Sequence, residues 1–136
     1  MSQQLADKVL NHLEFMGYAL EDLEAKEGHM HLATHDDKPT LLVFVSQDLV
    51  MLRSRFSGID ARAVKSKDFH ESMNTLNANS NITKWFYQDK DEDDEIDLVI
   101  EACDFEYEKK SFSKLVDALN AEIRVGLPTL HDFFKD

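Results

Sequence analysis

The chain has 136 residues, with 27 acidic and 15 basic side chains and a formal net charge of −12. This charge argues against nucleic acid or an anionic membrane surface as a direct partner, because both are bound by clustered Lys and Arg side chains. The length fits one domain over residues 1–136, and a hydrophobic content of 43% is enough for a sizeable core.

The sequence lacks the features of a secreted or membrane-spanning protein. No apolar run approaches the roughly 20 residues that a spanning helix needs. The N-terminal stretch has no basic start followed by a purely apolar segment. Cys103 is the single cysteine, so no internal disulfide is expected. A cytoplasmic protein is the simplest interpretation.

The first half of the chain predicts a helix followed by strands. Leu5, Val9 and Leu13 recur at helical spacing, and Gly17 suits the end of that helix. The expected elements are a helix over 2–16, a weak strand or irregular lead-in over 19–24, and strands over 29–34, 41–45 and 49–56. Short turns between these strands favour antiparallel pairing.

Alternating residues in the first strands predict which side chains face the core. In the strand over 29–34, Met30 and Leu32 are expected to face inward, and His29 and His31 outward. The strand over 41–45 is apolar on both faces, which is typical of a central strand covered on two sides.

The second half predicts a second helix, a strand pair and a closing helix. The expected elements are a helix over 67–79, strands over 82–88 and 96–102, and a helix whose apolar face runs from Phe112 to Ile123. Asp68 and Glu71 have the spacing of a capping box at the start of the second helix. The order α-β-β-β-α-β-β-α predicts an α+β fold with helices packed on an antiparallel sheet of about five strands.

The segment MNTLNANSNITKWFYQDKDEDDEIDLVIEA resembles the middle of the bacterial sensory-transduction-regulator (YbjN-like) family. That family typically has a helix ending in a Leu-Asn step, here Leu76-Asn77. A strand with a basic residue and aromatics follows, here from Lys84, and then a polar turn, an apolar strand and a closing helix. The element order also resembles the secretion-chaperone-like fold. An unusually acidic turn and a C-terminal extension ending in Phe133-Phe134 depart from the pattern.

The resemblance covers most of the chain in element order and rests mainly on 69–123 at residue level. It implies a non-enzymatic module that is often dimeric. Type III secretion chaperones of this fold bind extended segments of an effector on apolar surface patches. The regulator branch has no agreed ligand, so the resemblance assigns no binding residue to this chain.

The acidic turn over 89–95 does not match a calcium-binding loop. Asp89, Asp91 and Asp93 occupy positions 1, 3 and 5 of such a loop, but Asp94 stands where Gly is required and Ile100 where a bidentate Glu is required. The flanking segments are also strand-like. We interpret the turn as the solvated tip of a hairpin, whose charges keep exposed strand edges apart.

The sequence gives no support for catalysis. His29, His31 and His35 share one parity and could hold a metal together with Asp36 or Asp37, but their spacing is not a zinc signature, and a polar strand face is the favoured explanation. The acidic neighbours of Cys103 disfavour a reactive thiolate. No nucleophile, phosphate-loop or metalloprotease motif is present. We expect neither an enzyme nor a bound cofactor or metal.

The aromatic run Trp85-Phe86-Tyr87 offers a candidate binding surface. One arrangement buries Phe86 with Ile82 and leaves Trp85 and Tyr87 on the opposite sheet face, together with Met51. Trp and Tyr are frequent anchors of protein interfaces. The alternative, in which the terminal helix covers both rings, stays open.

Two functions follow from these observations. In the first, the protein is a chaperone-like or regulatory module that captures an apolar or basic segment of a partner protein. Trp85, Tyr87 and Met51 then form the binding surface. Asp91, Asp93 and Asp94 form an acidic rim that attracts the partner protein as it approaches. The same surface could instead form a homodimer interface. In the second, the acidic residues of 88–108 make the protein a decoy for a basic, nucleic-acid-binding protein.

Overall fold

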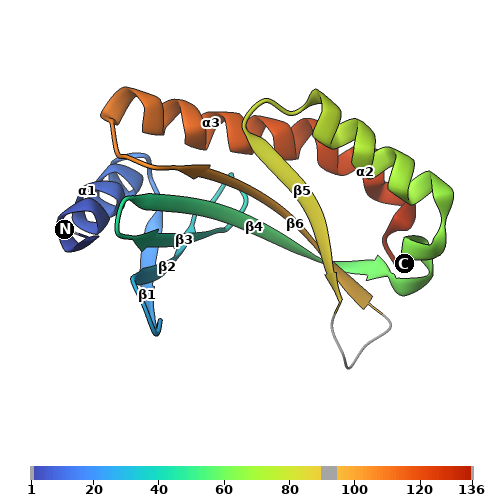
Figure 1. Cartoon of the computed structure of the whole chain (residues 1–136), viewed down its shortest axis with the longest axis horizontal. Helices are drawn as coiled ribbons and strands as arrows, with labels where there is room; N and C mark the ends of the chain where they lie inside the picture. Colours follow the sequence, from blue (N-terminus) through green and yellow to red (C-terminus); the bar gives the residue numbers. More distant parts are fainter. Residues whose placement is uncertain (1, 90–94, 136) are drawn as a thin grey trace.

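The computed structural model describes residues 2–89 and 95–135 and contains one antiparallel sheet with helices packed on one of its faces (Figure 1). The elements in order are α1 (Ser2–Phe15), β1 (Ala19–Leu23), β2 (His29–Thr34), β3 (Leu41–Ser46), β4 (Leu49–Asp60), the 3-10 helix η1 (Ala61–Lys65), α2 (Lys67–Asn79), β5 (Thr83–Asp89), β6 (Glu95–Asp104), α3 (Lys109–Gly126) and the 3-10 helix η2 (Leu127–Phe133). The predicted α+β class is confirmed, and the predicted element order holds except that four strands, not three, precede α2.

The sheet has six strands in the order β1-β2-β3-β4-β6-β5, and all neighbours are antiparallel. β5 and β6 form the predicted strand pair, with Trp85 opposite Ile100 and Asp89 opposite Ile96. The sixth strand is β1, for which the sequence predicted only a weak strand or an irregular lead-in over 19–24. It forms because Leu20 pairs with the fully buried Ala33 on the core face.

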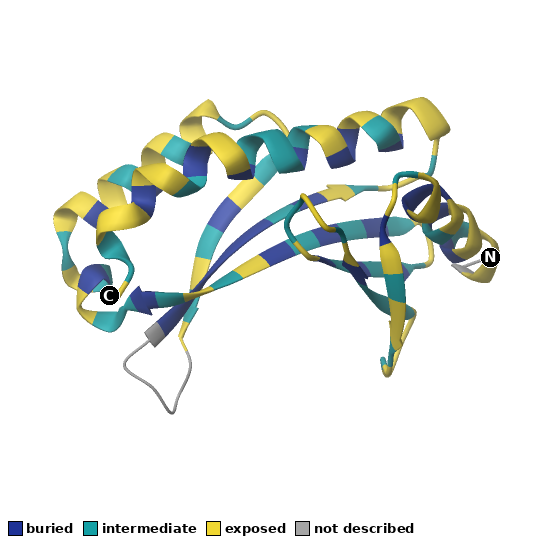
Figure 2. Cartoon of the chain, turned by 180° about the vertical axis from the view of Figure 1, so that it is seen from behind, coloured by how far each residue is buried: buried dark blue, intermediate teal, exposed yellow. Residues whose placement is uncertain are grey.

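The helices cover one face of the sheet and enclose the core. α1 packs on β1, β2 and β3, α3 on β6, and α2 on β5. Figure 2 shows buried positions alternating with intermediate ones along β3 and the first half of β4, and a continuous buried stretch over 96–100 of β6. The core contains Leu13 of α1, Leu52 of β4 and Leu119 of α3, all fully buried. In the part of the chain that the structure describes, no helix is long and apolar enough to cross a membrane.

The sequence signal for the end of α1 is confirmed, whereas the one for the start of α2 is not. Gly17 has φ +98° after α1, and the amide of Tyr18 donates to Leu13 O at 3.0 Å, so α1 ends in the left-handed turn that glycine favours. The predicted capping box at Asp68 and Glu71 is wrong. Ser66 is the N-cap of α2, and its hydroxyl accepts from the amide of Phe69 at 3.0 Å.

The C-terminal extension completes the end of the sheet beyond a bulge. β4 runs past its predicted end because the register shifts between Phe56 and Ile59, and Gly58 (φ +105°) lies in this bulge. Phe134 forms a bridge with Ile59, and the amide of Lys135 donates to Gly58 O at 2.7 Å. The tail therefore pairs with β4 where β6 no longer follows the regular register.

Candidate binding surfaces

The sheet face opposite the helices is the first candidate surface, and we call it the open sheet face. It is defined by the cross-strand pairs, because residues directly opposite each other point to the same side of a sheet. Leu42 pairs with Arg53, and Phe44 pairs with Met51. Arg53 pairs in turn with Glu101, so these positions of β3, β4 and β6 share this face.

The β1–β4 part of the open sheet face is apolar. Phe44 and Met51 lie at its centre, and both are half-buried although no described helix covers them. The apolar side chains that share this face are Leu23, Met30, Leu32, Leu42, Phe44, Leu49 and Met51. All seven are half-buried. A contiguous apolar area of this kind on a folded chain is typical of a protein-interaction surface.

The β4–β6–β5 part of the open sheet face carries paired charges. Arg53 Nη2 lies 2.7 Å from Glu101 Oε2, and Lys84 Nζ lies 3.6 Å from Glu101 Oε1. Both cations also lie 5.4 Å from the ring centre of Phe86, which is a cation–π distance.

A third ion pair lies on the same part of the face, where Arg55 Nε is 3.6 Å from Asp97 Oδ2. From β1 to β5, as far as the bulge, the described charged residues of the open sheet face are three bases and three acids, namely Arg53, Arg55, Lys84, Glu21, Asp97 and Glu101. The open sheet face is therefore close to neutral in a chain of net charge −12.

The second candidate surface is a groove of about 700 Å³ between α2 and α3, on the other side of the sheet. Trp85 and Leu76 contribute apolar surface to it. The α2 wall consists of Asp68, Glu71, Ser72, Thr75, Leu76 and Asn79. The α3 wall includes Ala121, Glu122, Val125 and Gly126. We call this the α2–α3 groove; three carboxylates and no cationic side chain are among its described lining residues.

Trp85 forms the floor of this groove and is only 3% exposed. α3 approaches it closely at Gly126, where a Cβ atom would lie 2.7 Å from Trp85 Cζ2 and 2.9 Å from Leu76 Cδ2. The Asn77 side chain of α2 fixes the backbone of the same residue, since Nδ2 donates to Trp85 O at 3.0 Å and Oδ1 accepts from Trp85 N at 2.8 Å.

The predicted arrangement of the aromatic run is wrong: Trp85 and Tyr87 lie on the core side, Phe86 lies on the open sheet face, and Ile82 is not buried. β5 pairs with β6 so that Trp85 is opposite Ile100 on the core side, and Phe86 is opposite Val99 on the open sheet face. The terminal helix covers Trp85, and Ile82 is 44% exposed. The prediction that Trp85 and Tyr87 share one side of β5 and Phe86 points to the other is confirmed. Which of these sides faces the helices depends on the rest of the fold.

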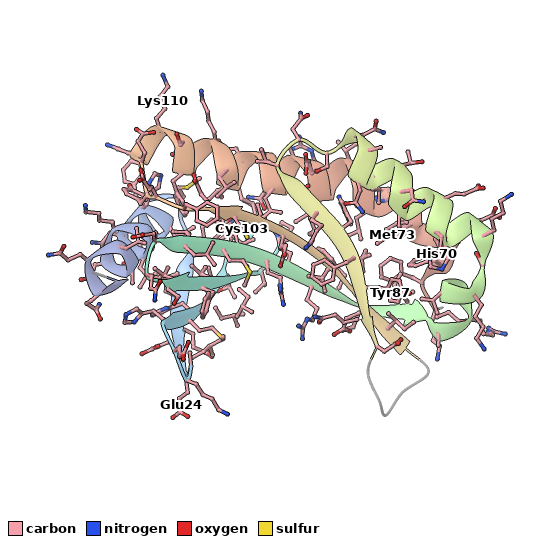
Figure 3. The ribbon with its side chains drawn as sticks, in the orientation of Figure 1. Glu24, His70, Met73, Tyr87, Cys103 and Lys110 are labelled. Atoms are coloured by element: carbon pink, nitrogen blue, oxygen red, sulfur yellow. The ribbon has the colours of Figure 1, made fainter. Side chains whose placement is uncertain are left out.

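Tyr87 shares the core side with Trp85 but lies at its margin. It is 37% exposed, and its ring packs edge-to-face against Phe69 at 5.8 Å between ring centres. Figure 3 shows it below α2 near His70, whose ring centre is 6.2 Å away. Met51, in contrast, lies on the open sheet face. Trp85, Tyr87 and Met51 therefore do not form one surface.

The acidic residues Asp91, Asp93 and Asp94 lie outside the described residues. β5 and β6, the strands on either side of them, pair antiparallel with Asp89 opposite Ile96. Whether 88–108 acts as a decoy for a basic protein stays a prediction.

The histidines of β2 face the opposite way from the prediction. His29 and His31 pair with Val45 and Val43 on the helix-covered side, whereas Met30 and Leu32 lie on the open sheet face. Ala33 lies on the same helix-covered side as His29 and His31 and is fully buried there.

His35 does not join the other two histidines. Its Nδ1 accepts from the amide of Asp37 at 3.0 Å, and its ring packs edge-to-face on Tyr18. Within residues 2–89 and 95–135, no group of three or more metal-ligating side chains is found. The thiol of Cys103 has a pKa above its ordinary value, because burial and then Glu101 disfavour the thiolate.

Sequence reasoning missed a polar cluster that joins α1 to the start of α3. His12 Nδ1 lies 2.7 Å from the Tyr107 hydroxyl, and its Nε2 lies 2.8 Å from Ser113 Oγ. Burial, followed by the nearby charge of Lys109, holds the pKa of His12 below its usual value of 6.5. The partners are 95 and 101 residues away in sequence, so no local pattern could reveal the cluster.

We expect this cluster to make stability depend on pH. A lowered pKa means that the folded state favours neutral His12, so its contribution is fully present above about pH 6.5 and is lost as the pH falls through the lower folded pKa. Urea unfolding between pH 7.5 and 5 should show a falling free energy of unfolding, with a shallower fall for His12→Gln. His131→Gln serves as the control. Equal slopes for wild type and His12→Gln would contradict this role.

Comparison with known proteins places the fold. No protein-family model and no curated protein matches the sequence. Among solved structures, YbjN from E. coli, a candidate transcription regulator, matches with a TM-score of 0.71 and 14% identity over 96% of each chain. An uncharacterised protein from Methanothermobacter thermautotrophicus matches with a TM-score of 0.67 and 9% identity, over 99% of this chain and 100% of that one. The likeness expected from the sequence is confirmed, and the chain has the α+β fold of YbjN over nearly its whole length.

Proposed function

We propose that the protein is a non-enzymatic protein-binding module that holds an apolar segment of another polypeptide on the open sheet face. The observation that carries this proposal is the set of seven half-buried apolar side chains on β1–β4, with no described helix over them. The fold likeness to a candidate regulator supports a binding role over a catalytic one.

The electrostatics of the open sheet face favour an apolar segment over a basic one. Its described charges balance, and Arg53 and Lys84 both already pair with Glu101. A basic segment would therefore gain no long-range attraction from this face. Binding there should depend on apolar contact with residues such as Phe44 and Met51, and should change little with salt.

Replacing Phe44 by aspartate tests the proposal. Phe44 is at the centre of the apolar part, so a charge there should weaken binding of an unfolded polypeptide about tenfold or more. The probe is fluorescently labelled, reduced and carboxymethylated α-lactalbumin, and the measurement is fluorescence anisotropy at low and high salt. Phe105→Asp is the matched control, because Phe105 is an exposed phenylalanine (71%) that lies beyond the end of β6 and belongs to no strand.

Three results would contradict the proposal. The first is equal affinity of wild type and Phe44→Asp for the probe. The second is an equal loss of affinity in Phe105→Asp. The third is light scattering that shows a wild-type dimer and a Phe44→Asp monomer, which would assign the open sheet face to a second copy of the chain.

A further inference from the structure

The α2–α3 groove is elongated and follows one face of α2 over its whole length. Its α2 lining residues fall at positions 68, 71, 72, 75, 76 and 79, which are spaced as one stripe of a helix. With a rise of about 1.5 Å per residue, this stripe is about 16 Å long, or three helical turns. A groove of this length between two helices matches a third helix better than a compact small molecule.

The floor and walls of the groove differ in chemistry. Trp85, Leu76 and Val125 provide apolar surface, and Val125 is 70% exposed although it is a branched aliphatic side chain. Gly126 contributes no side chain of its own, and its small size allows α3 to rest on Trp85. An apolar helix face laid along this floor would bury surface that now contacts water.

The charged residues of the groove all have one sign. Asp68 and Glu71 lie on α2, and Glu122 lies across the groove on α3. Glu122 is held in place because Ser80 donates to its Oε2 at 2.9 Å and Thr83 donates to the same oxygen. Its Oε1 accepts no hydrogen bond from the described residues. The groove thus presents a fixed carboxylate opposite two exposed ones.

We propose that the α2–α3 groove binds an amphipathic helix of a partner protein whose flanks carry Lys or Arg. The apolar stripe of that helix lies on Trp85, Leu76 and Val125, and its basic flanks face the carboxylates of both walls. This site is separate from the open sheet face, which lies on the other side of the sheet, and its acidic walls make its salt response different.

Trp85 allows a direct test, because it is the only tryptophan in the chain. The probe is a dansyl-labelled helical peptide of about 15 residues, with Leu at helical spacing and Lys elsewhere. Energy transfer from Trp85 to the dansyl group measures binding. A peptide with the same Leu stripe and Glu in place of Lys is the control. We expect saturable binding of the Leu/Lys peptide that weakens steeply with salt, and no binding of the Leu/Glu peptide.

Variants localise the binding. Val125→Asn removes exposed apolar surface and should weaken the Leu/Lys peptide about tenfold. Asp68→Asn and Glu71→Gln should weaken it about threefold each, as expected for exposed charge pairs. Phe15→Asn is the control for Val125, because Phe15 is an exposed apolar residue (86%) on α1. Asp22→Asn is the control for the acids, because Asp22 lies on β1.

The proposal is overturned if the Leu/Glu peptide binds as tightly as the Leu/Lys peptide, or if Val125→Asn leaves the affinity unchanged. It is also overturned if light scattering shows a wild-type dimer that Val125→Asn dissociates, because a second copy would then occupy the groove. Circular dichroism confirms that each variant is folded before its affinity is compared.

Discussion

Replacing Trp85 by alanine is expected to lower the free energy of unfolding by about 3–5 kcal/mol, as for other large aromatic residues of a core. Trp85 is 3% exposed and lies against Gly126 of α3, which also approaches Leu76 of α2, so its loss leaves a cavity where both helices meet the sheet. The measurement is urea unfolding followed by far-ultraviolet circular dichroism, because the variant has no tryptophan to report by fluorescence.

Tyr87→Ala is the matched control for this substitution. Tyr87 is the next residue of β5 on the same side and is 37% exposed, so its loss should cost clearly less than the loss of Trp85. A small effect of Trp85→Ala, together with loss of binding to a partner, would restore the role that the sequence suggested for this residue. A large effect identifies Trp85 as a core residue that shapes the α2–α3 groove from below.

The element order could be predicted because it depends on local signals. Alternating or helical periodicity marks each main element. Gly17 ends α1 because it adopts the left-handed backbone conformation that glycine favours. The strand pair around the acidic turn was equally accessible, since two β-rich runs flank residues that cannot pack in a core. These signals lie within windows of about ten residues.

The faces of the strands could not be predicted, and the candidate surfaces depended on them. Periodicity divides the residues of β5 into two sets, but only the pairing of Trp85 with Ile100 and the position of α3 show which set is covered. The same holds for β2, where the pairing with β3 places the small Ala33 on the helix-covered side and the larger Met30 and Leu32 on the open sheet face. A small residue under a helix gives little hydrophobic signal in sequence, so the pattern of larger residues indicated the wrong side.

The two surfaces differ in charge, and this difference separates their partners experimentally. The described charges of the open sheet face balance, whereas the α2–α3 groove is lined by three carboxylates and no described cation. Salt should therefore weaken a ligand of the groove and leave a ligand of the open sheet face almost unchanged. Phe44→Asp and Val125→Asn should each affect one ligand and spare the other, because they lie on opposite sides of the sheet.

Replacing Asn77 by alanine is expected to lower the free energy of unfolding by about 2–3 kcal/mol, because two part-buried backbone groups of β5 lose their partner. β5 is the edge of the sheet, and Asn77 accepts from the amide and donates to the carbonyl of Trp85 on its unpaired side. This side chain therefore protects part of an edge that would otherwise be available for strand pairing between molecules.

Asn79→Ala is the control for this substitution, since Asn79 is an exposed residue of the same helix that makes no such contact in the described chain. We expect it to unfold nearly as the wild type does, and Asn77→Ala to unfold at lower urea and to form larger species at high protein concentration. Urea unfolding and concentration-dependent light scattering measure the two effects. If Asn77→Ala and Asn79→Ala behave alike in both measurements, the side chain does not anchor α2 to the edge strand, and packing on Trp85 alone holds the helix there.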